Sequence, residues 1–161
     1  MNTDLMFSSK TDLWSTPQWL YDQLHKEFNF TLDPCATDFN HKCDKYFTKE
    51  QDGLKQDWGE DTVFINPPYG REVGKWVKKA FETHKAYNNT LVMLLPARTD
   101  TRWFHEYIYC KAEIRFLKGR LKFGESKNSA PFPSMVVVYR GINRKPIPGQ
   151  THIDDLLGGA K

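Results

Sequence analysis

The stretch TVFINPPYG, residues 62–70, joins an apolar run to two consecutive prolines. Residues 62–65 carry the β-branched and aromatic side chains that are typical of a buried strand. Because proline has no backbone N–H, the chain must leave the sheet at Pro67 and Pro68. Apolar residues then recur at helical spacing, at Val73, Trp76, Val77, Ala80 and Phe81. This spacing predicts an amphipathic helix directly after the turn.

Similar patterns extend outward in both directions. Ser15-Thr16-Pro17 predicts a hydroxyl cap with proline at the first helical position, and the helix should end near Phe28. We expect strands at residues 30–32, 91–95, 114–117, 120–123 and 135–139, and a helix at 103–108. Residues 36–61 are expected to form polar loops with a short helix or strand.

Strands that alternate with helices predict one α/β domain with a doubly wound, mixed sheet. The last predicted strands follow one another closely, which favours an antiparallel hairpin at the sheet edge. Functional groups should then lie at the carboxyl ends of the strands. We expect a flexible lead-in at residues 1–13, the domain at 14–140 and a loose tail at 141–161.

Composition excludes several classes of protein. Hydrophobic residues make up 39% and charged residues 27% of the 161 residues, as in a soluble globular protein. Apolar runs are too short for a membrane helix, and we expect no signal peptide. Three cysteines do not suggest a disulfide scaffold and fit the cytoplasm. The net charge of +3 neither requires nor excludes a polyanionic partner.

The residues Asn66-Pro67-Pro68-Tyr69 are compatible with a plain turn, but the strand before them and the helix after them favour a functional loop. An exocyclic amine is a poor nucleophile because its lone pair is delocalised into the ring. The Asn66 side-chain oxygen and the Pro67 carbonyl could accept its two hydrogens, and Tyr69 could stack on a flipped base. This arrangement resembles the catalytic loop of amino-methyltransferases that use S-adenosylmethionine.

Further motifs sharpen the resemblance. Together with the catalytic loop they are similar, over about residues 14–140, to the phage-type DNA N6-adenine methyltransferase (Dam) family. The resemblance implies a single Rossmann-like methyltransferase domain in a bacterial host cytoplasm, encoded by a phage or prophage. The motifs, in chain order, are Trp14-Ser15-Thr16-Pro17, Leu32-Asp33-Pro34-Cys35-Ala36, Asp52-Gly53-Leu54, Asp57-Trp58, residues 95–101 (LPARTDT), Gly119-Arg120-Leu121-Lys122-Phe123 and Ala130-Pro131-Phe132-Pro133-Ser134.

The resemblance also implies the residues that bind S-adenosylmethionine and its product S-adenosylhomocysteine. Asp33 and Asp52 match the family's acidic residues, although a turn former and a surface carboxylate explain them too. No Gly-x-Gly stands near Asp33, and the ribose contact is unassigned, with Asp38 and Asn40 as candidates. The remaining cofactor candidates are Thr16, Pro17, Pro34, Cys35, Ala36 and Asn66; capping the first helix explains Thr16 and Pro17 equally well.

Basic residues interleaved with aromatics suit contacts to DNA phosphates and bases. A solvated hairpin with core phenylalanines is the alternative. Double-stranded DNA is the expected partner, with no membrane, no metal, and the oligomeric state left open. The candidates for DNA contact are Arg98, Arg102, Arg120, Lys122, Lys127, Asn128 and Phe132.

Alternative functions remain at this point. Three other functions share parts of the pattern: methylation of cytosine at N4, methylation of glutamine in proteins, and DNA binding by an inactive relative. Enzymes that methylate cytosine at N4 usually have Ser at the position of Asn66. Pro34-Cys35 resembles the nucleophile of cytosine-C5 methyltransferases, but a buried structural cysteine explains it better. His41 and Cys43 lack the paired spacing of a metal site.

Overall fold

The computed structural model describes residues 15–124 and 126–142. The predicted lead-in at residues 1–13 lies outside this range, as do residues 143–161 of the tail predicted at 141–161. The strands are β1 (Leu32–Asp33), β2 (Lys45–Tyr46), β3 (Val63–Ile65), β4 (Leu91–Pro96), β5 (Glu113–Phe116) and β6 (Ser134–Tyr139). The α-helices are α2 (Gln18–Phe28), α3 (Val73–Tyr87) and α4 (Arg102–Tyr107), and η1 (Gly53–Lys55) is a 3-10 helix.

The six strands form one mixed sheet with the order β2-β1-β3-β4-β6-β5. Strand β1 is parallel to β2 and β3, and β3 is parallel to β4. Strand β6 is antiparallel to both β4 and the edge strand β5. The predicted α/β class and the antiparallel pair at the edge are therefore confirmed.

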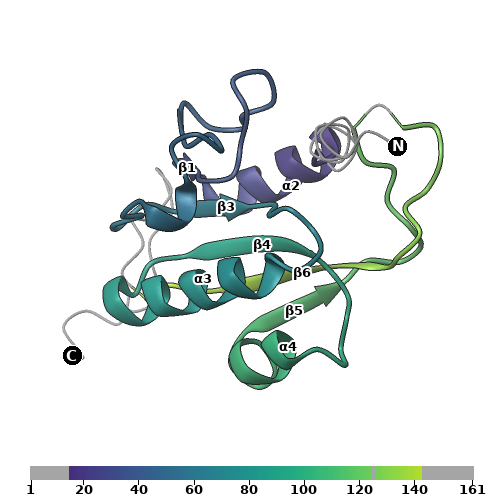
Figure 1. Ribbon diagram of the computed structural model, residues 1–161. Coiled ribbons are helices and arrows are strands. Elements are labelled where there is room, and N and C mark those ends of the chain that lie inside the picture. The colour runs from purple at the N-terminus through teal and green to yellow at the C-terminus, as the bar shows by residue number, and fades with distance from the viewer. Residues whose placement is uncertain (1–14, 125, 143–161) are drawn as a thin grey trace, which may run out of the picture.

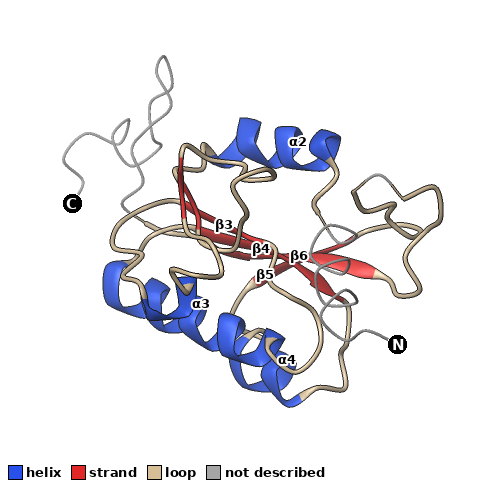
Figure 2. Ribbon diagram, turned by 45° about the horizontal axis from the view of Figure 1, so that its top comes forward, coloured by secondary structure: helices blue, strands red, loops and turns tan. Residues whose placement is uncertain are grey.

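Helices cover both faces of the sheet. Figure 2 shows α2 on one face and α3 with α4 on the other, so that the domain has three layers. Alternate side chains of β4 point to opposite faces of the sheet. Leu91, Met93 and Leu95 pack with α3 and α4, whereas Val92 and Leu94 pack with α2. This alternation follows from the two-residue period of a strand. Continuous apolar runs thus mark strands that are buried on both faces.

Two details of the predicted elements are wrong. Residues 120–123 form no strand; they lie in the long connection between β5 and β6, where Leu121 and Phe123 are buried against α2. Pro17, and not a hydroxyl residue, is the N-cap of α2, and no side chain caps this helix. The extended backbone of Pro17 (ψ 132°) places it just before the first helical turn.

A charge network joins α2 to the last two strands. The guanidinium of Arg115 binds both carboxylate oxygens of Glu27 at 2.7 Å, and Arg140 lies 3.5 Å from the same carboxylate. Both arginines lie over the ring of Phe28, with distances of 5.4 and 5.2 Å to its centroid. Hydrogen bonding from Arg115 is the main cause that lowers the pKa of Glu27. The C-terminal turn of α2 is thereby held against the sheet.

Across the described parts of the chain, none of the helices has the length and apolar character that crossing a bilayer would require.

Candidate active site

The parallel strands β1, β3 and β4 and the antiparallel strand β6 direct four loops to one edge of the sheet, where β1, β3 and β4 end and β6 begins. Asp33 ends β1, Asn66 follows β3, and Pro96 ends β4. The first residue of β6, Ser134, pairs with Pro96, so the preceding loop also reaches this edge. Figure 1 shows the connection from β3 to α3 and the long loop before β6 on the same side of the domain. The carboxyl ends of parallel strands are where α/β proteins place their ligands.

The catalytic-loop candidates leave the sheet as the sequence predicts. Pro67 is buried and Pro68 is exposed, whereas Asn66 is half-buried. The Asn66 amide Nδ2 donates to the hydroxyl of Thr16 at 3.0 Å, across 50 positions of the chain. The two prolines restrict the backbone, so the loop is preorganised. Its proposed catalytic role stays a prediction.

Tyr69 is wedged among aromatic residues. Its hydroxyl donates to the Leu94 carbonyl at 3.2 Å. Its ring makes edge contacts with the rings of Phe123 and Phe132, at centroid distances of 6.0 and 5.3 Å. Burial raises the pKa of the phenol, which therefore stays protonated and keeps donating. Phe123 is a core residue, as the alternative interpretation expected, but it also fixes the orientation of Tyr69.

The carboxylate of Asp33 organises the loop after β1. It accepts hydrogen bonds from the backbone N–H of Lys42 at 3.0 Å and of Cys35 at 3.3 Å. Burial raises the pKa of Asp33, and these two backbone hydrogen bonds partly oppose that rise. The predicted turn-forming role of Asp33 is therefore present, and cofactor binding by Asp33 stays a prediction.

Cys35 and Ala36 lie in the same loop, and the Ala36 N–H donates to the Phe47 carbonyl just after β2. Burial raises the pKa of the Cys35 thiol. A thiolate is the form that attacks carbon, so this environment does not favour the C5-type nucleophile.

The Asp52 loop packs directly against the Asp33 loop. Gly53 faces the Pro34 carbonyl, and the indole N–H of Trp58 donates to the Gly53 carbonyl at 2.9 Å. Asp52 accepts from the Leu54 N–H at 3.2 Å, and its side chain is 41% exposed. The motifs around Asp52 and Trp58 therefore form one structural unit beside β1, with a partly exposed carboxylate.

The two candidates for the ribose contact already have protein partners. Asp38 accepts from the Tyr46 hydroxyl at 2.7 Å. The Asn40 amide accepts from the Thr37 N–H at 2.7 Å and donates to the Ser15 hydroxyl at 3.1 Å. These hydrogen bonds hold the β1–β2 loop in place. They do not show which residue contacts a ribose.

The basic candidates differ in their surroundings. Arg98, Arg120, Lys122 and Lys127 are exposed, and no carboxylate within the described ranges pairs with them. Arg102 instead pairs with Glu106 one turn along α4. Exposed Asn128 and half-buried Phe132 lie in the loop before β6. The structure therefore brings together a basic loop and the catalytic edge, and DNA contact stays a prediction.

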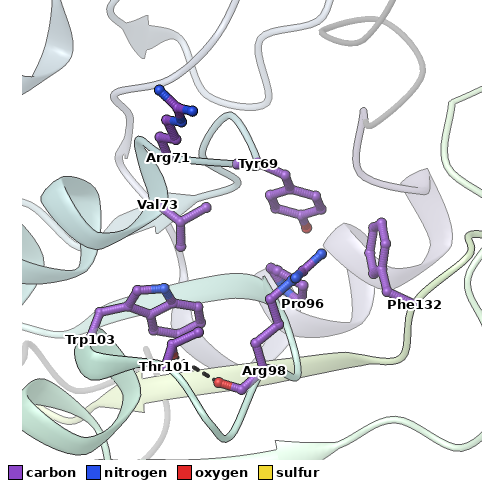
Figure 3. Close-up of a pocket in the computed structure, with 9 residues that line it drawn as sticks. Tyr69, Arg71, Val73, Pro96, Arg98, Thr101, Trp103 and Phe132 are labelled. Atoms are coloured by element: carbon purple, nitrogen blue, oxygen red, sulfur yellow. Dashed lines mark hydrogen bonds between the residues drawn. The ribbon is translucent and has the colours of Figure 1, made fainter.

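A cavity of about 290 Å³ opens beside Tyr69, at the lower end of the range for small-molecule pockets. Figure 3 shows Arg98 extending between Trp103 and Phe132 toward Tyr69. Arg71 and Trp103 line this cavity and were not among the sequence candidates. The sequence predicts Trp103 only as a helix residue, and no local motif marks it as part of a site. Its position at the cavity depends on how α4 packs beside α3.

Among the residues that the structure describes, no group of three acidic, histidine or cysteine side chains could hold a metal ion. The imagined ligands His41 and Cys43 have other partners. The His41 ring bonds to the Cys43 carbonyl and stacks on Tyr46. The Cys43 thiol lies 3.5 Å from the Tyr21 hydroxyl, and burial raises its pKa to about 11.

A mixed sheet of this order, with an Asn-Pro-Pro-Tyr loop after a central strand, is consistent with a Rossmann-like methyltransferase fold. A family model described as "DNA N-6-adenine-methyltransferase (Dam)" matches residues 4–152. The chain therefore belongs to the DNA N-6-adenine-methyltransferase (Dam) family, as its motifs predicted.

Two relatives carry the same description. The chain is 33% identical to the DNA N-6-adenine-methyltransferase of Haemophilus phage HP1 (strain HP1c1), covering 81% of this chain and 80% of that protein. It is 39% identical to the DNA N-6-adenine-methyltransferase of Escherichia phage T1, over 68% of this chain and 46% of that longer protein.

Proposed function

We propose that this protein transfers a methyl group from S-adenosylmethionine to the N6 amine of adenine in duplex DNA. Family membership and the names of the two phage relatives support the reaction. The observation that carries it in this chain is the Asn66–Tyr69 loop, held rigid beside a cavity and a set of exposed cations. We place the reaction in the cytoplasm of a bacterial host of a phage or prophage.

The chemistry requires two acceptors and an aromatic surface. The Asn66 Oδ1 and the Pro67 carbonyl accept the two amine hydrogens and favour a pyramidal nitrogen with its lone pair available for attack. Tyr69 stacks on the adenine that has left the duplex. Catalysis depends mainly on alignment of the amine with the methyl group, so a rigid Asn66 is essential.

The loops after β1 and β2 carry groups that fit an adenosine cofactor. Asp52 keeps a partly exposed carboxylate that can accept from an adenine amine, beside a loop in which Gly53 leaves no room for a β-carbon. Asp33 shapes the neighbouring loop through its two backbone hydrogen bonds. S-adenosylmethionine supplies a methyl group on a sulfonium, so no strong base is needed and the amine loses its proton to solvent.

DNA would bind across the catalytic edge. The exposed residues Arg98, Arg120, Lys122 and Lys127 provide cations for phosphates, and Phe132 narrows the space beside Tyr69. The cavity bordered by Tyr69, Arg98 and Trp103 adjoins the catalytic loop, although Asn66 and Pro67 are not among the residues that line it.

The test compares the wild-type protein with Asn66→Ala in a methyl-transfer reaction on unmethylated duplex DNA. We expect label from S-adenosylmethionine to enter N6-methyladenine with the wild-type protein only. Calorimetry should give S-adenosylmethionine dissociation constants for the two proteins that agree within about threefold, because Asn66 acts on the target amine. Loss of cofactor binding in Asn66→Ala would contradict this assignment.

A further inference from the structure

The short segment before α2 bonds to three loops of the active-site edge. The Thr16 hydroxyl accepts from Asn66 Nδ2 at 3.0 Å. The Ser15 hydroxyl accepts from the Asn40 amide at 3.1 Å, and the Ser15 carbonyl accepts from the Gly124 N–H at 2.8 Å. The two residues Ser15 and Thr16 thus connect the catalytic loop, the β1–β2 loop and the loop before β6.

Thr16 is held in place by its surroundings. Its side chain is 5% exposed, and it does not cap α2. The proline that follows restricts the Thr16 backbone to extended conformations. That proline is itself buried, and its carbonyl accepts from the N–H groups of Leu20 and Tyr21, so the segment is anchored to α2. The position of the Thr16 hydroxyl, which accepts the hydrogen bond from the catalytic loop, is consequently fixed.

The orientation of the Asn66 amide decides whether it can assist the target amine. Its Oδ1 can accept an N–H of that amine, whereas Nδ2 is only a donor and would repel it. Because Nδ2 is directed to Thr16, Oδ1 occupies the other branch of the amide group. The hydrogen bond therefore fixes Oδ1, which is buried in this structure, as the amide atom that is turned away from Thr16.

We propose that Thr16 is a positioning residue, which sets the orientation of the Asn66 amide through its hydroxyl. This inference rests on the proposed function of Asn66 and assigns Thr16 to catalytic alignment rather than to cofactor affinity.

The experiment compares Thr16→Val, which removes the hydroxyl at nearly constant volume, with Thr16→Ser, which keeps it. Thr83→Val on α3, where a buried threonine lies outside the active-site edge, is the matched control. We expect Thr16→Val to lower kcat about 10- to 100-fold at saturating DNA and cofactor, as misalignment does. We expect Thr16→Ser to stay within about threefold of wild type because its hydroxyl can still accept. The cofactor dissociation constant should not change in either variant.

Three outcomes overturn the inference: weaker cofactor binding with unchanged kcat, unchanged kcat and affinity, or equal loss in the valine and serine variants. Thr16→Ala provides the same comparison if the valine variant does not fold.

A second readout does not need activity. The side-chain amide signals of Asn66, identified by their loss in Asn66→Ala, should shift in ¹⁵N–¹H spectra of Thr16→Val and remain unchanged in Thr83→Val. Unshifted signals in Thr16→Val overturn the inference even if the wild-type protein methylates no DNA. Absence of methyl transfer by the wild type, with the shift present, would instead contradict only the proposed function.

Discussion

A β-carbon added to Gly53 would lie 2.0 Å from the carbonyl oxygen of Pro34 and 3.0 Å from the ring of Trp76. The loop that carries Asp52 is therefore in direct backbone contact with the loop that follows Asp33. The indole of Trp58 holds this contact from the other side by donating to the Gly53 carbonyl. Two short sequence motifs thus depend on each other for their shape.

Gly53→Ala should separate these two loops. Because the obstructing atom belongs to the backbone, we expect a destabilisation of about 2 kcal/mol, as for overpacked interiors. Cofactor affinity should fall as well, since Asp52 moves with its neighbour. Denaturant unfolding and calorimetry measure the two effects. Gly59→Ala is a useful comparison, because its β-carbon would meet no atom within 4 Å although its φ is positive. Unchanged cofactor affinity in a folded Gly53→Ala protein would contradict the assignment of Asp52.

Substitutions of Tyr69 should separate its ring from its hydroxyl. Tyr69→Phe loses the bond to the Leu94 carbonyl but keeps the stacking surface, so we expect kcat/KM within about fivefold of wild type. Tyr69→Ala removes the surface, and we expect a loss of about 5- to 150-fold, which corresponds to about 1–3 kcal/mol per stacked base. Steady-state methylation of duplex DNA measures both. Equal losses in the two variants would show that the hydroxyl, and not stacking, is the important group.

Exposed cations on the catalytic edge should control the salt dependence of DNA binding. Each phosphate contact contributes about 0.9 to the slope of log K against log salt concentration. We therefore expect Lys122→Ala and Arg98→Ala each to weaken binding and to reduce this slope by about 0.9. Lys78→Ala is the control, because Lys78 pairs with Glu82 on α3 away from the catalytic edge. Titrations of DNA at several salt concentrations test this. A slope as large in Lys122→Ala as in wild type would exclude Lys122 from the interface.

The ion pair at the end of α2 should make stability depend on pH. The pKa of Glu27 lies below its usual value of 4.5 in the folded protein, so the unfolded chain binds the proton more readily. Its contribution is therefore fully present above about pH 4.5 and is lost as pH falls through the folded pKa. Glu27→Gln should lower the melting temperature at pH 7, and the difference from wild type should shrink below pH 4.5. A difference that is constant from pH 7 to pH 3 would contradict this.

Much of the fold could be predicted because the strands β3, β4 and β6 are apolar on both faces. The same reasoning failed at residues 120–123, where Leu121 and Phe123 alternate with Arg120 and Lys122 as in a strand. Both apolar side chains are buried, but the segment has no neighbouring strand to pair with. Strand β2 has only two residues, neither of them buried, so no pattern distinguishes it.

Less of the candidate site than of the fold could be predicted from the sequence. Asn66 and Tyr69 belong to a local motif that directly follows β3, and their catalytic roles stay predictions. The bond from Thr16 to Asn66 spans 50 positions, and local spacing carries no information about such a contact. Trp103 reaches the cavity only because α4 packs beside α3, which the sequence does not specify at the level of single residues.

The central claim is tested most directly by the products of methyl transfer. Purified protein is incubated with unmethylated duplex DNA and labelled S-adenosylmethionine, and the digested nucleosides are identified by mass spectrometry. The account predicts N6-methyladenine with the wild-type protein and none with Asn66→Ala. Label in N4-methylcytosine, or in protein and not in DNA, would contradict it.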